Sequence, residues 1–122
     1  MQKTNFKKID GTEFPAGRKT RVLIGESGAI KNLKFAQGFV EIYPGGSVPM
    51  HKHSNQESYT ILKGKGEITL DDEKTDVVDG DVILIPPNTS HELVNTGDEN
   101  MYMMFVYTPG NIVDHWQEEL EK

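Results

Sequence analysis

The chain consists of short apolar runs separated by turn-forming residues, and it shows little helical periodicity before residue 111. Gly, Pro, Asn and Asp fill the intervening segments, where they favour turns because Gly and Asn tolerate positive φ and Pro restricts φ. This pattern predicts an all-β sandwich or barrel. The predicted strands are Thr20–Ile24, Leu33–Tyr43, Glu57–Leu62, Gly66–Leu70, Thr75–Val78, Asp81–Ile85, His91–Asn95 and Met101–Tyr107.

The end of the chain follows a different pattern. Ile112, Trp116 and Leu120 recur at a spacing of four residues, which places them on one face of a helix, and Asn111 can cap its start. We therefore expect a barrel over residues 20–110 and a C-terminal helix over residues 111–122. This helix either packs on the barrel as part of the core, or covers the barrel mouth or a second subunit.

Length, composition and charge exclude several classes of protein. A chain of 122 residues fits one domain. Its formal net charge is −6, with 13 Lys and Arg against 19 Asp and Glu, which disfavours binding to nucleic acids or anionic membranes. The absence of cysteine excludes disulfides, thiolate zinc sites and cysteine nucleophiles. No segment approaches the roughly 20 apolar residues of a membrane span, so we expect a soluble, cytoplasmic protein.

Three of the four histidines fall into a pattern typical of metal ligands. On a strand, His51 and His53 project from the same face, and after a turn Glu57 opens the next strand beside them. His91, at the start of a later strand, offers a third imidazole. Such a set suits one divalent transition metal ion (Mn, Fe, Co, Ni or Zn) and suits Ca²⁺ or Cu(I) poorly. Four protein ligands leave an octahedral ion two positions for a substrate, or for substrate and O₂.

Two segments resemble the conserved motifs of the cupin family. The first cupin motif, G(X)5HXH(X)3,4E(X)6G, is matched at every specified position by Gly45, His51, His53, Glu57 and Gly64. The second motif, G(X)5PXG(X)2H(X)3N, is matched by Gly80, Pro86, His91 and Asn95, but Asn88 replaces its internal glycine. Asn tolerates the left-handed backbone conformation best after Gly, so we expect the turn to survive.

This resemblance implies an antiparallel jelly-roll barrel of about six to eight strands with a metal inside it. It also implies that His51, His53, Glu57 and His91 are the metal ligands. Small cupins commonly form homodimers by pairing sheets or exchanging N-terminal strands. We therefore expect a homodimer in which the polar residues 1–19 are an exchanged or disordered arm.

Other residues are candidates for lining the same pocket. If Glu57 faces inward, strand alternation places Tyr59 and Ile61 on the same face. Tyr59 is then either a catalytic group beside Glu57 or a core residue whose hydroxyl bonds to the backbone. Arg18 and Arg21 either clamp a carboxylate substrate or form a solvated strand end.

The sequence does not fix a single reaction. Cupins include dioxygenases, decarboxylases, isomerases, lyases and non-catalytic modules that bind sugars, effectors or acids. Oxalate-degrading cupins usually place an arginine where this chain has Val48, which disfavours an oxalate decarboxylase. We expect a metal-dependent enzyme, of the dioxygenase, lyase or isomerase type, whose small organic substrate binds through oxygen atoms. The alternative is a non-catalytic module that holds a small acid or sugar at the metal.

Overall fold

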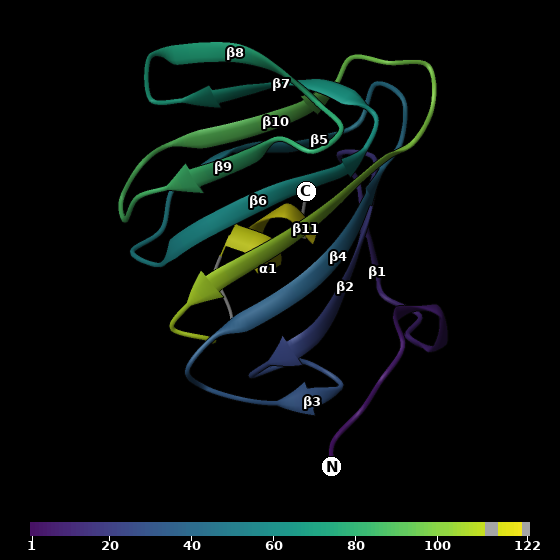
Figure 1. The fold of residues 1–122 in the computed structure, drawn as a ribbon. Helices are drawn as coiled ribbons and strands as arrows, with labels where there is room; N and C mark the ends of the chain where they lie inside the picture. Colours follow the sequence, from purple (N-terminus) through teal and green to yellow (C-terminus); the bar gives the residue numbers. More distant parts are fainter. Residues whose placement is uncertain (112–114, 121–122) are drawn as a thin grey trace.

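The computed structural model describes residues 1–111 and 115–120, which form an all-β fold with one short α-helix (Figure 1). A 3₁₀ turn spans Phe6–Lys8, and α1 spans His115–Leu120. The strands are β1 (Thr12–Phe14), β2 (Arg18–Gly25), β3 (Ile30–Lys31), β4 (Ala36–Ile42), β5 (Ser47–His51), β6 (Gln56–Lys63), β7 (Lys65–Leu70), β8 (Glu73–Val78), β9 (Val82–Ile85), β10 (His91–Asn95) and β11 (Met101–Thr108). The predicted all-β class is confirmed.

The strands form two sheets that enclose the core. The larger sheet has the order β1-β2-β4-β11-β6-β9, with β3 attached to β2, and the smaller has the order β5-β10-β7-β8. All strand pairs are antiparallel except β2–β3. In Figure 1 the smaller sheet lies above, and β11, β4 and β2 of the larger sheet lie below. The buried core cluster draws on both sheets, as in a jelly roll.

Strand alternation decides which side chains face the interior. On β6, Glu57, Tyr59 and Ile61 are buried while the residues between them are not, as the sequence predicted. The run from Met101 to Tyr107 is apolar on both faces, so its pattern alone does not set its orientation. In the structure Met101, Met103, Phe105 and Tyr107 are the buried set of β11.

The predicted strand over Leu33–Tyr43 is shorter in the structure. It begins only at Ala36, and Leu33 lies before it with 67% of its surface exposed. The Asn32 side chain accepts a hydrogen bond from the Lys34 backbone N–H at 2.8 Å, and such an Asx turn competes with strand pairing. The strand β3 is too short to produce a periodic signal in the sequence.

The first nineteen residues pack on their own chain in this structure. Within them, β1 pairs with β2 in the register Thr12↔Thr20, and the Phe6 ring stacks on Phe39 with ring centroids 4.3 Å apart. Phe14 at the end of β1 is buried. The exchange of this arm between subunits and the homodimer stay predictions.

The second motif closes into a turn that supports the first. Asn88 has a φ of 61°, which is the left-handed conformation expected at the position where the motif has glycine. Its backbone N–H donates a hydrogen bond to the His53 carbonyl oxygen at 2.8 Å, so the two motif loops are tied together. Asn95 ends the motif in a structural role, because its side-chain amide donates to the carbonyl oxygens of Ile42 and Glu99.

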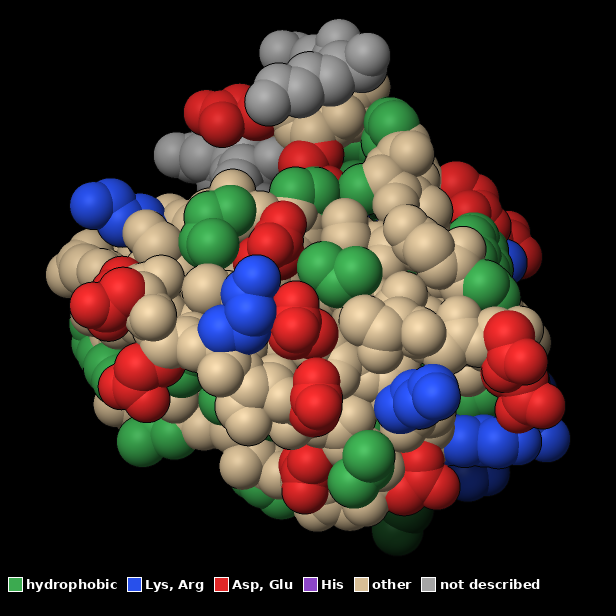
Figure 2. Space-filling view, turned by 90° about the horizontal axis from the view of Figure 1, so that it is seen from above, with side chains coloured by type: hydrophobic (Ala, Val, Ile, Leu, Met, Phe, Trp, Pro, Cys, Tyr) green, Lys and Arg blue, Asp and Glu red, His purple; other side chains and the backbone are tan. Residues whose placement is uncertain are grey.

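The surface agrees with the acidic composition. Seen from above, on the side nearest β8, acidic side chains are spread over the molecule with basic side chains among them (Figure 2). Among the described residues, no helix is long and apolar enough to cross a membrane.

The left-handed conformation of Asn88 generates a stability prediction. Replacing exposed Asn88 by Ala introduces a side chain that disfavours positive φ, and we expect the free energy of unfolding to fall by about 1 kcal/mol. Asn88→Gly is the matched control and should cost less than Asn88→Ala. Urea denaturation of the three proteins measures the difference. Equal stability of the Ala and Gly variants would contradict this interpretation of the turn.

Candidate metal centre

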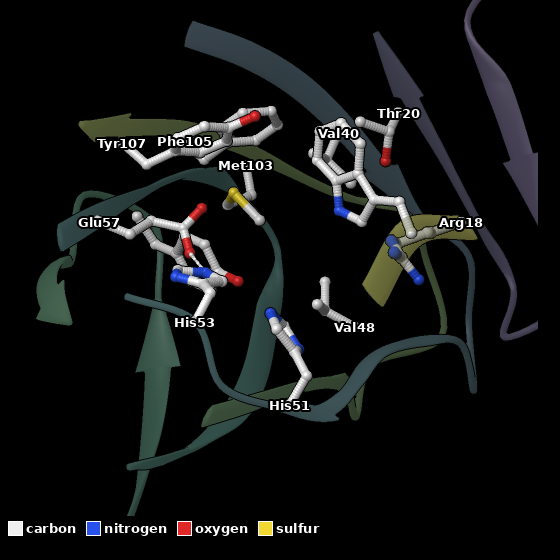
Figure 3. Close-up of a pocket in the computed structure, with 12 residues that line it drawn as sticks. Arg18, Thr20, Val40, Val48, His51, His53, Glu57, Met103, Phe105 and Tyr107 are labelled. Carbon is white, nitrogen blue, oxygen red and sulfur yellow. Dashed lines mark hydrogen bonds and ion pairs between the residues drawn. The ribbon is translucent and has the colours of Figure 1, made fainter. Parts of the chain in front are cut away.

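Three strands and one loop bring the four predicted ligands together. His51 is the last residue of β5, His91 is the first of β10, and the two face each other as partners across that strand pair. Glu57 comes from β6 in the other sheet. The cluster therefore lies between the two sheets, and Figure 3 shows His51, His53 and Glu57 around the same pocket.

His53 reaches the cluster by a different route from the one predicted. The strand β5 ends at His51, so His53 lies in the loop that follows and strand alternation does not orient it. Hydrogen bonds to other parts of the chain instead hold this loop in place. The Asn55 side-chain amide donates to the Pro109 carbonyl oxygen at 2.8 Å, and the His53 carbonyl oxygen accepts from Asn88.

The donor atoms of the four side chains converge on one point. One ligand atom from each of His51, His53, Glu57 and His91 lies within 4.8 Å of all the others. Glu57 Oε1 lies 3.2 Å from His53 Nε2 and 3.3 Å from His91 Nε2. These separations leave room for a single ion among the four groups.

Hydrogen bonds to the backbone orient all three imidazoles. In each ring Nδ1 lies next to a carbonyl oxygen, at 2.7 Å for His51 and Pro49, 3.1 Å for His53 and Asn55, and 2.8 Å for His91 and Thr89. Because a carbonyl oxygen only accepts, Nδ1 must donate, and a neutral ring then carries its lone pair on Nε2. This is the arrangement of metal-ligating histidines.

His91 gives the clearest indication of a missing partner. Its side chain is completely buried, and its Nε2 has no hydrogen-bond partner. Leaving a buried polar atom unsatisfied costs about 1–3 kcal/mol. With Nδ1 donating to Thr89, Nε2 presents a lone pair 3.3 Å from a carboxylate oxygen, where two acceptors face each other. A cation between them satisfies both, so the residues present fit a metal ion.

The electrostatic environment favours the protonation states that a metal requires. Burial, reinforced by nearby His91, lowers the pKa of His51 to about 4. Burial by itself raises the pKa of the Glu57 carboxyl, but the neighbouring His53 and His91 side chains outweigh it and lower the pKa overall. At neutral pH His51 is therefore a neutral imidazole and Glu57 an anionic carboxylate, the forms in which both bind metals.

Comparison with known proteins agrees with this geometry. The family model described as the cupin domain matches residues 38–107, a range that contains all four clustered side chains. The chain belongs to the cupin family.

Individual relatives differ in what is known of them. An uncharacterised protein of Methanocaldococcus jannaschii is 36% identical over 97 residues, 79% of this chain and 77% of the relative. A gentisate 1,2-dioxygenase of Aquipseudomonas alcaligenes is 34% identical over 90 residues, which cover 69% of this chain but only 26% of that enzyme. Among solved structures, KdgF from Halomonas sp. superposes with a TM-score of 0.75 at 17% identity, covering 90% of this chain and 94% of that one. The last similarity shows the shared cupin fold.

The cluster opens into a narrow pocket inside the cupin barrel. The space left in it is about 20 Å³, roughly enough for one water molecule. Its walls come from both sheets and from α1, and they are made by Arg18, Thr20, Val40, Val48, His51, His53, Glu57, Tyr59, Met103, Phe105, Tyr107 and Trp116. Sequence reasoning did not assign Phe105 or Met103 to this wall, because β11 is apolar on both faces.

Tyr59 lines the pocket two residues after Glu57, as alternation predicted. Its ring lies 6.0 Å from the His91 ring, measured between centroids, and is almost fully buried. Burial and the nearby Glu57 carboxylate raise the pKa of the Tyr59 phenol well above its ordinary value. The hydroxyl therefore keeps its proton at neutral pH, so it can donate a hydrogen bond but is a poor base.

The two candidate arginines lie in different environments. Arg21 is half-buried and pairs with Glu41 at 2.7 Å, outside the pocket. Arg18 lines the pocket and is only 1% exposed, with its guanidinium bound to Glu119 of α1. The interpretation of Arg18 as part of a solvated strand end is therefore wrong.

The C-terminal helix also contributes to the pocket. Trp116 lines it, whereas Leu120, predicted on the same helix face, is exposed. Ile112, the third member of that predicted stripe, lies outside the described residues.

The shifted pKa of His51 predicts how the metal-free protein responds to acid. The folded state disfavours protonated His51, so below its ordinary pKa of 6.5 the unfolded state binds more protons. Stability should therefore fall as the pH drops from 6.5 toward 4. For this group the loss between pH 7 and pH 5 is about 2 kcal/mol.

His51→Gln removes this titration and serves as the comparison. In EDTA, urea denaturation at pH 7 and pH 5 should show a loss that is about 2 kcal/mol smaller in the variant than in the wild type. Equal losses in the two proteins would contradict the proposed state of His51.

Proposed function

We propose that this cupin is a metal-dependent enzyme acting on a small organic molecule that binds through oxygen atoms inside the barrel. The proposal rests on one observation. Three oriented imidazoles face Glu57, and His91 Nε2 is buried without a hydrogen-bond partner. A structural metal site usually fills every coordination position with protein ligands. Here three of the four clustered side chains, His51, His53 and Glu57, line an internal pocket, which favours a site that also receives a substrate.

The ligand set defines the class of metal. His51, His53, Glu57 and His91 would hold one divalent ion, and three imidazoles with one carboxylate suit Mn²⁺, Fe²⁺, Co²⁺, Ni²⁺ or Zn²⁺. Such an ion, when bound, supplies Lewis acidity toward the oxygen atoms of a substrate and, if it is redox-active, chemistry with O₂.

Aromatic side chains exclude water from the pocket, and the Tyr59 hydroxyl places a proton inside it. Phe105 and Tyr107 stack with ring centroids 5.5 Å apart on the pocket wall, and Trp116 meets both rings edge-on. These apolar walls lower the local dielectric, which strengthens charge interactions inside. Tyr59 is the residue we assign to donate a hydrogen bond to a substrate oxygen, because its phenol stays protonated.

Similarity to a dioxygenase supports one reaction class among those considered. The gentisate 1,2-dioxygenase relative is 34% identical over 90 residues, 69% of this chain. We therefore place dioxygenase chemistry ahead of lyase or isomerase chemistry.

A non-catalytic binding module is the second candidate. Burial raises the pKa of both Tyr59 and Tyr107, and Glu57 is committed to the cluster, so none of these groups is free to act as a general base. A module that holds a small acid or sugar at the metal needs no base.

Turnover assays distinguish these functions. Protein loaded with Fe²⁺ or Mn²⁺ is incubated with a panel of small hydroxy and oxo acids, and substrate loss and O₂ uptake are followed. We expect turnover that stops in EDTA, returns with metal, and falls on the order of 100-fold in Glu57→Gln. Glu92→Gln, which changes a half-buried carboxylate outside the cluster, is the matched control and should keep full activity.

Turnover that survives chelation would overturn the proposed metal-dependent enzyme. Saturable, metal-dependent binding of a panel compound without its consumption would instead establish the binding module.

A further inference from the structure

Arg18 is a buried cation in the wall of the metal pocket. In Figure 3 it lies across the pocket from Glu57 and His53, and it is the one Lys or Arg among the residues that line this pocket in the described part of the chain. Burying an unpaired charge is costly, so a guanidinium kept at this position requires an anionic partner.

The barrel itself fixes the guanidinium in place. The Phe14 ring lies beneath it, with 4.1 Å between the guanidinium carbon and the ring centroid, and Nη1 donates to the Ser47 carbonyl oxygen at 3.2 Å. Both contacts come from the β1–β2 and β5 regions. Arg18 therefore has contacts that hold it toward the pocket without help from α1.

Its anionic partner, in contrast, comes from the C-terminal helix. Glu119 receives two parallel hydrogen bonds, from Arg18 Nη1 to Oε2 at 2.6 Å and from Nη2 to Oε1 at 2.8 Å. This end-on, two-point geometry is one in which arginine also recognises the carboxylate of a small molecule. Glu118, the preceding residue, is exposed, whereas Glu119 is half-buried.

The same helix contributes Trp116 to the pocket wall. Trp116 packs edge-on against Phe14 at 6.3 Å and Phe105 at 5.9 Å between ring centroids. Only about 20 Å³ remains free, whereas sites for organic ligands commonly enclose about 300–1,000 Å³. An organic substrate therefore needs more room than this, and displacement of Trp116 would provide it.

We infer that the substrate is a small organic acid whose carboxylate replaces that of Glu119 on Arg18 as α1 is displaced. This inference rests on the proposed function, since it places an oxygen donor of the same molecule at the His–Glu cluster. The exchange substitutes one carboxylate for another, so Arg18 is never left buried without an anion. A neutral sugar offers no such replacement, and Arg18 thereby selects acids.

The inference is tested on the metal-free protein, so that its outcome does not depend on metal binding. Benzoate is the probe, and benzamide, which has nearly the same shape but no charge, is the matched ligand. Binding is followed through the proton NMR signals of each compound. Trp116 is the only tryptophan of the chain, so its fluorescence reports displacement of α1.

We expect benzoate to bind and to shift Trp116 emission to longer wavelength, while benzamide does neither at the same concentration. In Glu119→Gln, which removes the competing charge, the dissociation constant of benzoate should fall about tenfold. Glu118→Gln makes the same charge change on the exposed side of the helix and should leave the constant unchanged.

Equal benzoate affinity in Glu119→Gln and Glu118→Gln, or equal binding of benzamide and benzoate, would overturn the inference. So would the absence of benzoate binding to both the wild type and Glu119→Gln. Arg18→Gln should abolish the preference for benzoate, and if that variant does not fold, the Glu119 comparison still decides.

A protein that turns over a neutral compound with its metal but ignores benzoate would refute this inference alone. One that binds benzoate but no metal would refute only the proposed function.

Discussion

Three hydrogen bonds from imidazole Nδ1 atoms to backbone carbonyl oxygens set the chemistry of this barrel. They fix the rings of His51, His53 and His91 so that the Nε2 lone pairs face the Glu57 carboxylate. The carbonyl partners lie two residues from each histidine, so the local backbone orients each side chain. The jelly roll then has only to bring three strands and one loop to the same place between its sheets.

The pocket combines this cluster with a second charged group on its far side. Arg18 lies across the interior from Glu57, held by Phe14 and Ser47, and its charge is neutralised by Glu119. Apolar side chains separate the two ends. A pocket with a metal-type cluster at one end and a guanidinium at the other is complementary to a small acid that carries a second oxygen donor, which unites the proposed function with the proposed substrate class.

The sequence predicted the cluster better than its surroundings, for physical reasons. Metal-type ligands follow a fixed spacing, and Asn88 took the left-handed conformation that the motif requires. The location of His53 was right, although it lies in a loop rather than on a strand. The environment of Arg18 could not be predicted, because its anionic partner Glu119 lies 101 residues away in the sequence. Phe105 was missed because only sheet pairing decides which face of an apolar strand is buried.

Metal content is the direct test of whether the His–Glu cluster binds an ion. Elemental analysis is made on the wild type and His51→Ala, both purified without an affinity tag and again after incubation with Mn²⁺, Fe²⁺ or Zn²⁺. We expect about one equivalent of a divalent transition metal in the wild type and its loss in the variant, because three imidazoles and a carboxylate bind such ions together. A wild type that takes up no metal, or a variant that retains as much as the wild type, would contradict this expectation.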